Sequence, residues 1–334
     1  MKKLLFLLVA GAVLAAPFRA GACDVCGCSG GGGYFGILPQ FQRSFVGLRW
    51  QDRVLDSYEP ASSLDPAANA HSVFRTLDLW GRWYPLRRVQ LIAFVPVHFF
   101  RQQENETLQQ TRGLGDITLM ANYTLLNTAD APGRRWKHTL QVGPGIKLPT
   151  GRFRMEDADG VEYHPNLQPG TGSTDVLLNL VYTIRRGSLG MQVDAQTRLN
   201  TENADRYRFG HRQNAAVRFF WWQNLGNNLA ILPRAGVAID AARKDVWYAS
   251  TQEETGGHSV FADLGLDVYI GNLAVGAGFQ APIRYDLGNG MVTPKGNLAV
   301  SATWAFGGKK GAPSMPPPAV FPNVPAPSNN STEN

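Results

Sequence analysis

The chain has 334 residues, and its 32 Lys and Arg against 26 Asp and Glu give a formal net charge of +6. Removal of the first 22 residues, which hold Lys2, Lys3 and Arg19, would lower that charge to +3 (6 minus 3). So mild and unclustered a charge excludes a nucleic-acid partner, whereas the length allows two soluble domains or one large β-barrel.

Residues 1–22 are predicted to be a secretory signal peptide. Lys2 and Lys3 precede the apolar run 4–16, and the small residues 20–22 precede the cleavage point. The apolar run is too short to cross roughly 30 Å of hydrocarbon as a helix. No later stretch is long and apolar enough to do so either. We therefore expect an exported protein of a Gram-negative bacterium.

All three cysteines follow the predicted cleavage point, as Cys23, Cys26 and Cys28. Three thiols among glycines suit a soft cation, so Cu(I) or Zn(II) is one interpretation. A disulfide with one thiol left over is a second. Lipidation of Cys23 is a third, although Ala20 stands where a larger aliphatic residue is usual. Residues 23–40 are predicted to be a Cys/Gly-rich periplasmic segment or a plug in the barrel.

From residue 41 to residue 306, apolar and polar residues alternate in twelve runs. Successive side chains of a strand point to opposite faces, so each run predicts a strand with one apolar and one polar face. The runs cover residues 45–55, 72–84, 89–99, 117–125, 136–148, 175–184, 189–200, 211–222, 229–240, 259–270, 273–284 and 298–306.

The connections between these runs alternate between long polar loops, such as 56–70, 102–114 and 151–170, and short turns. An even strand number and loops sorted in this way are typical of outer-membrane barrels, and closure removes exposed edges. We expect an all-β fold, an antiparallel transmembrane β-barrel of about 12 strands, with both chain ends periplasmic. Residues 307–334, with seven prolines, are expected to be a disordered Pro-rich tail.

Three short motifs lie at predicted strand ends: Gly-Leu-Gly-Asp at 113–116, Leu-Pro-Thr-Gly at 148–151 and Pro-Gly-Thr-Gly-Ser-Thr-Asp at 169–175. In order and spacing they resemble the outer-membrane transporter family associated with the meta-pathway of phenol degradation. That family is distantly similar to fatty-acid channel barrels. The resemblance covers residues 41–306 and implies a barrel that moves small, often hydrophobic molecules. The Cys-rich head and the Pro-rich tail depart from the pattern and leave the substrate open.

The polar face of the predicted strands carries charges of both signs. One interpretation is a network of ion pairs that fills and seals a narrow lumen, because buried charges need partners. The other is a mildly anion-favouring pore, since bases outnumber acids. The bases are Arg49, Arg53, Arg82, Arg88, Lys137, Lys147, Arg198, Arg212, Arg218, Arg234 and Arg284, and the acids are Asp78, Asp116, Asp175, Asp194, Asp240, Asp263 and Asp267.

The sequence gives little support to an enzyme. It contains none of the hydrolase, metalloprotease or nucleotide-binding motifs. By alternation His138 and His211 face lipid or a girdle. His98 faces the lumen, where a lone histidine is more often a member of a polar network than a base.

We therefore predict an outer-membrane channel or transporter for small solutes, including hydrophobic or aromatic ones. Its expected partners are outer-membrane lipid, the solute and a periplasmic protein. One alternative is soft-metal handling through the three cysteines. Another is a structural barrel that anchors a periplasmic partner.

Overall fold

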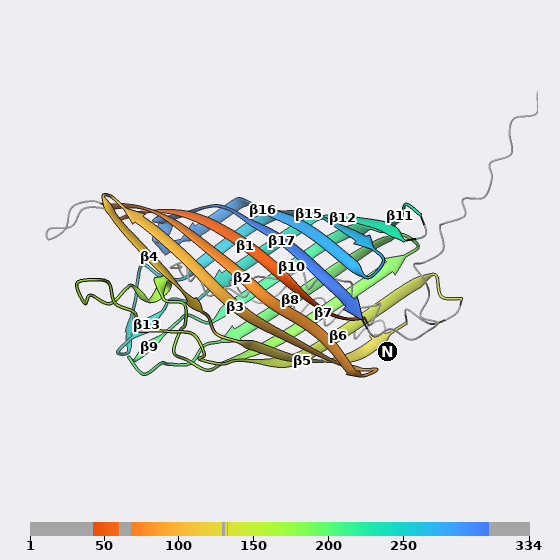
Figure 1. Cartoon of the computed structure of the whole chain (residues 1–334), viewed down its shortest axis with the longest axis horizontal. Coiled ribbons are helices and arrows are strands. Elements are labelled where there is room, and N and C mark those ends of the chain that lie inside the picture. Colours follow the sequence, from red (N-terminus) through yellow and green to blue (C-terminus); the bar gives the residue numbers. More distant parts are fainter. Residues whose placement is uncertain (1–42, 60–67, 129–130, 132, 227, 307–334) are drawn as a thin grey trace, which may run out of the picture.

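The computed structural model describes residues 43–59, 68–128, 131, 133–226 and 228–306. Within these ranges, twelve long strands form one closed antiparallel barrel (Figure 1). The predicted fold class is confirmed. The predicted signal peptide, the Cys/Gly-rich segment with Cys23, Cys26 and Cys28, and the Pro-rich tail lie outside the described residues.

Each wall strand pairs with the next wall strand along the chain, and the pairing of β1 with β17 closes the ring. The tiny strand β11 (Gln223–Asn224) follows β10 in the sequence and pairs with β12. The wall strands are β1 (Ser44–Glu59), β2 (Ala68–Leu86), β3 (Val89–Glu104), β5 (Thr118–Asn127), β6 (Trp136–Lys147), β7 (Asp175–Arg186), β8 (Leu189–Leu199), β10 (Arg212–Trp221), β12 (Leu229–Ala242), β15 (Gly257–Ile270), β16 (Leu273–Leu287) and β17 (Val292–Phe306).

One predicted loop is wrong. Residues 102–114 do not form a loop, because β3 continues to Glu104 and pairs with β4 (Thr107–Leu114) after a tight turn. Asn105 takes the left-handed conformation that this turn requires (φ 46°). The hairpin projects at the long-loop end of the barrel and therefore lacks the apolar face by which a strand is recognised (Figure 1).

The outer face of the wall is apolar. Leu48, Leu79, Leu178, Phe219 and Leu264 are each about half exposed. Exposure of so large an apolar surface to water is unfavourable, whereas contact with lipid suits it. Four exposed tryptophans stand near the short-turn ends of four strands, as an interfacial girdle does in a membrane barrel. They are Trp83, Trp136, Trp221 and Trp304.

The inner face is polar, and most of its charged side chains are buried. The alternation therefore sorts apolar residues outward and polar residues inward, the reverse of a soluble protein. In the described part of the chain, no helix is both long and apolar enough to cross a membrane.

The two ends of the barrel differ. Short turns lie at one end. The other end carries the longer connections, including the small sheet of β9 (Tyr207–Arg208), β13 (Val246–Trp247) and β14 (Ser250–Thr251) (Figure 1). Two short 3-10 turns, η2 (Pro165–Leu167) and η3 (Gly288–Gly290), complete the described structure.

Candidate functional site

A continuous group of ion pairs crosses the inner wall from β8 to β15. Arg218 lies between two acids, with Nη1 2.5 Å from Asp194 Oδ1 and Nη2 3.0 Å from Asp263 Oδ2. Arg234 continues the group, with Nη1 3.1 Å from Asp263 Oδ1 and Nε 3.5 Å from Asp267 Oδ2. We call these five residues the acid–base cluster. Because three acids meet two bases, the cluster adds no net positive charge to the lumen.

Beside this cluster lies a cavity of about 110 Å³ inside the barrel. Its lining includes Arg49 and Arg53 of β1 as well as Arg218 and Arg234. Arg49 pairs at 2.8 Å with Asp78, whereas the Arg53–Asp240 distance is 3.8 Å. Phe74 and Phe261 add apolar surface, so the cavity offers both charged and apolar contacts.

The remaining predicted interior residues occupy several environments. Arg82 is buried over the rings of Phe45 and Tyr84. Arg198 and Arg212 are both buried and lie directly opposite each other on β8 and β10. Lys137, half-buried, is the partner of Arg185 in the β6–β7 register.

Two arginines assigned to the lumen by alternation are exposed. Arg88 lies in the turn before β3, where its side chain donates to Tyr123 Oη at 3.5 Å. A bulge shifts the β15–β16 register between Val260 and Phe261, which places Arg284 opposite Val260. Sequence alternation cannot reveal such a shift, because one extra residue moves every later side chain to the other face.

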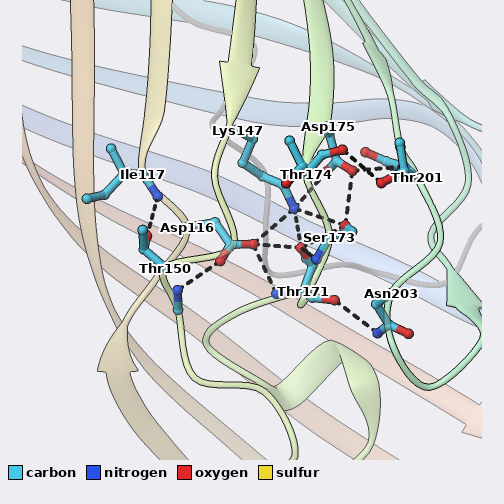
Figure 2. A network of polar contacts seen from close by, with 12 residues as sticks. Asp116, Ile117, Lys147, Thr150, Thr171, Ser173, Thr174, Asp175, Thr201 and Asn203 are labelled. Carbon is cyan, nitrogen blue, oxygen red and sulfur yellow. Dashed lines mark hydrogen bonds and ion pairs between the residues drawn. The ribbon is translucent and has the colours of Figure 1, made fainter.

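The most densely bonded site lies at the long-loop end, around the amine of Lys147 (Figure 2). Lys147 is the last residue of β6, and its Nζ lies 2.9 Å from Asp116 Oδ2 and 2.6 Å from Asp175 Oδ2. The same amine donates to the hydroxyl of Thr171, and Ser173 donates to Asp175 at 3.0 Å. We call Asp116, Lys147, Thr171, Ser173 and Asp175 the loop anchor.

Backbone donors complete the loop anchor. Asp116 accepts from the amides of Gly151 (2.9 Å) and Thr171 (3.0 Å), and Asp175 accepts from the amide of Thr201 (2.9 Å). These bonds compensate for the second buried carboxylate, which the single lysine cannot neutralise. Asp116 lies between β4 and β5, outside both strands. Burial alone would raise its pKa, but Lys147, Thr171 and Gly151 together hold the pKa below its ordinary value of 3.8.

The three motifs of the sequence meet here, and close packing explains their glycines. A Cβ on Gly151 would lie 2.6 Å from Gly170 Cα, and one on Gly170 would lie 2.4 Å from the Gly151 carbonyl carbon. A Cβ on Gly115 would lie 2.3 Å from the His98 ring. Side chains at Gly151 and Gly170 would force apart the two ends of the β6–β7 connection, and one at Gly115 would displace the His98 ring.

That connection, residues 148–174, folds inward, and we call it the plug loop. Its η2 turn is buried, with Leu167 only 1% exposed. Thr111 of β4 donates to the Leu167 carbonyl, and Gln168 bonds to the backbone of Met155 and Tyr163. Leu167 belongs to an apolar cluster with residues of β1, β2, β3, β16 and β17: Leu55, Phe74, Phe100, Leu287 and Val292. Since β6 and β16 stand on opposite sides of the ring, the loop extends across the mouth.

A row of side-chain amides lines the wall below the plug loop. Asn179 Nδ2 donates to Asn122 Oδ1 at 3.1 Å, and Asn122 Nδ2 donates to Gln90 Oε1 at 2.9 Å. Gln90 in turn donates to Tyr84 Oη at 2.6 Å. This row places neutral polar groups on the inner face of β3, β5 and β7, next to the strands that carry the acid–base cluster.

His98 is buried, and its Nδ1 lies 2.9 Å from Thr76 Oγ1, where it belongs to a polar network. Within the described ranges, no group of three or more His, Cys, Asp or Glu is arranged to hold a metal ion. The predicted Cu(I) or Zn(II) ligands Cys23, Cys26 and Cys28 lie outside those ranges.

The inward fold of the plug loop was not predicted, because residues 151–170 read as a polar surface loop. One signal was available: residues 165–174, Pro-Asn-Leu-Gln-Pro-Gly-Thr-Gly-Ser-Thr, contain no charge. A surface loop rarely stays uncharged over such a length, whereas a buried one must avoid unpaired charges.

No known protein family matches the sequence, and no curated protein is similar to it. Solved structures share the fold. The COG4313 outer membrane channel from Pseudomonas putida F1 superposes with a TM-score of 0.57 at 14% identity, covering 87% of this chain and 100% of that one.

A Pseudomonas aeruginosa FadL homologue matches with a TM-score of 0.37 at 12% identity, covering 79% of this chain and 91% of that one. The translocator domain of the autotransporter NalP from Neisseria meningitidis has a TM-score of 0.37 at 13% identity, covering 79% and 88%. The match to the COG4313 channel, at 14% identity, shows a shared fold alone, and the two matches with TM-scores of 0.37 support no further conclusion.

Proposed function

We propose that the protein is a channel of the bacterial outer membrane for small solutes, with its short turns in the periplasm and its long loops outside. The observation that carries the proposal is a polar, charged interior enclosed by an apolar wall, with the uncharged segment 165–174 of the plug loop packed across its mouth. An apolar exterior with a tryptophan girdle supports insertion in a membrane. A polar interior supports passage of solutes rather than a purely structural role.

The plug loop would control this passage. It leaves from the ends of β6 and β7 and is held by the loop anchor, while Leu167 packs across the mouth. The anchored segment fixes where the loop starts and ends, and residues 152–169 form the removable obstruction. Loops of this kind, placed on a rigid scaffold, commonly carry function.

The substrate class rests on two supports. The cavity joins phenylalanine surface to arginines, which suits small molecules with an apolar body and a polar group. The motifs that resemble the phenol-degradation transporters extend the proposal to hydrophobic and aromatic solutes.

A deletion offers a direct test. Because the backbones of Gly151 and Gly170 are in contact, joining Gly151 to Gly170 removes residues 152–169 and keeps the amides that bind Asp116. In lipid bilayers we expect this variant to conduct far more than the wild type, and liposomes that carry it to admit small aromatic alcohols faster. A folded deletion variant that does not conduct would refute the channel proposal and favour a structural barrel.

Soft-metal handling is a second candidate, favoured by the Cys-x-x-Cys-x-Cys spacing of Cys23, Cys26 and Cys28. The test is the metal content of the mature chain, refolded under reducing conditions, beside the variant with all three cysteines changed to serine. Near-stoichiometric copper or zinc in the parent alone would support it. Absence of metal from both would remove it.

A further inference from the structure

The outer face of β2, β3 and β4 changes abruptly from apolar to basic near the long-loop end. Leu77, Val97 and Leu114 form one outward row across the three strands. The next row outward is Arg75, Phe99 and Arg112, and the row after it contains Arg101. The apolar row marks where acyl chains would end, so the arginines begin at the level of lipid headgroups.

The three guanidinium groups are exposed and only partly neutralised. Arg75 Nε lies 3.0 Å from Asp52 Oδ2. Among the described residues, the side chains of Arg101 and Arg112 form neither an ion pair nor a hydrogen bond. We call Arg75, Arg101 and Arg112 the outer arginine patch. One acid against three bases leaves the patch positive.

Register brings the three arginines within reach of one ligand. Arg101 lies diagonally from both Arg75 and Arg112 on adjacent strands, and such pairs are about 7–8 Å apart. Arg75 and Arg112 lie on either side of Phe99, about 10 Å apart across two strand spacings. Guanidinium forks at this spacing suit phosphate groups, which they bind with two parallel hydrogen bonds.

We propose that the outer arginine patch binds the phosphate groups of lipopolysaccharide, the phosphorylated glycolipid of the outer leaflet. This inference rests on the outer-membrane location and orientation proposed above. Lipopolysaccharide matches both halves of the surface: acyl chains against Leu77, Val97 and Leu114, and sugar phosphates against the arginines. Phe99, whose ring lies 6.1 Å from that of Trp50, would pack at the boundary between them.

The opposite end of the barrel provides a matched control. Arg87 and Arg88 are also exposed and stand on the turn between β2 and β3, at the short-turn end. Removing this pair changes the net charge as much as removing Arg101 and Arg112 does. Arg87 and Arg88 lie at the end of the barrel opposite the outer arginine patch, so their loss should not affect lipid A binding at the patch.

The experiment compares Arg101→Gln/Arg112→Gln and Arg87→Gln/Arg88→Gln with the wild type. Affinity for bis-phosphorylated lipid A is measured by native mass spectrometry of full-length protein in detergent, after heat-modifiable gel mobility has shown that each variant is folded. We expect the first pair to bind about 10- to 30-fold more weakly, since each basic residue adds about 1 kcal/mol toward an anionic lipid. The second pair should match the wild type, and dephosphorylated lipid A should bind all three proteins equally weakly.

Equal affinity of all three proteins for bis-phosphorylated lipid A would overturn the proposal, and so would a larger loss in the Arg87/Arg88 variant. Conductance measured on the same proteins separates this inference from the channel proposal. Two results together would refute the channel and support the lipid site. The loop-deletion variant would not conduct, and affinity for lipid A would fall only in the Arg101→Gln/Arg112→Gln variant.

Discussion

Lys147 is a buried residue whose single ammonium group joins the ends of two strands to a loop. Its amine touches carboxylates that come from the β4–β5 break and from β7. Removing one partner from such a group leaves uncompensated charge in a buried place, which costs more than the intact pair contributes.

We expect Lys147→Met to destabilise the barrel by about 3–5 kcal/mol and to raise its conductance, because Asp116 and Asp175 would repel each other and release the plug loop. Denaturant unfolding in lipid vesicles measures the first effect. Adding Asp116→Asn and Asp175→Asn to the same chain should restore most of the stability. A triple variant as unstable as the single one would contradict this electrostatic explanation.

Acid should also release the plug loop. The folded-state pKa of Asp116 is below its ordinary value of 3.8, so its stabilising contribution is complete above that value and is lost as pH falls through the lower, folded-state pKa. We expect conductance to stay level from neutral pH to about pH 5 and to rise only below pH 3.8. A rise already at pH 6 would show that another group holds the loop.

Gly170→Ala should disturb the same site sterically, since the added methyl would meet the Gly151 backbone at 2.4 Å. The expected result is a looser loop, seen as faster protease cleavage within residues 152–169. Thr174→Ala is the control, because the Thr174 side chain is exposed and its carbonyl still binds Thr201. Equal cleavage of both variants would show that the close packing has no role.

At the scale of elements, the strands were predictable and the plug loop was not. Alternation over residues such as Val176 to Ile184 specifies a strand with a period of two, and all twelve runs became wall strands. Where a hairpin extends beyond the lipid, as the β3–β4 hairpin does, neither face has to be apolar. The alternation that identifies a strand in the sequence is then lost. The ion pairs of Arg218 join β8, β10 and β15, which stand close together in the wall, and this pairing depends on strand register and wall curvature and not on local sequence.

The plug loop should depend on Leu167 more than on any exposed residue. Leu167→Ala removes most of a buried side chain from a five-strand apolar cluster, so we expect a loss of about 2–5 kcal/mol together with higher conductance. Val161→Ala, at a position 62% exposed in the same loop, should change neither. A silent Leu167→Ala variant would mean that the loop is held by its anchor alone.

The molecule as a whole has apolar residues outside and polar residues inside, the reverse of a soluble protein. The loss of stability caused by a charge on the outer wall should therefore depend on how deep in the membrane that charge lies. Val217 faces outward midway along β10, whereas Gln213 faces outward near its long-loop end. Val217→Arg should destabilise the barrel in lipid by about 2–4 kcal/mol, and Gln213→Arg by about 0–1. Unfolding of both variants in vesicles is the measurement. Equal costs would show that the two positions lie at the same depth.

The position of the closing strand pair predicts the order in which contacts form during folding. The loop anchor joins residues 116–175, all within one contiguous stretch, whereas the last seam pairs Ser44 with Phe306. Closing so long a segment costs more chain entropy than joining nearby strands, so the seam is expected to form late. The plug loop would then already be anchored at its two ends while the sheet is still an open ribbon, and Leu167 would meet its full apolar cluster only when β1 joins β17.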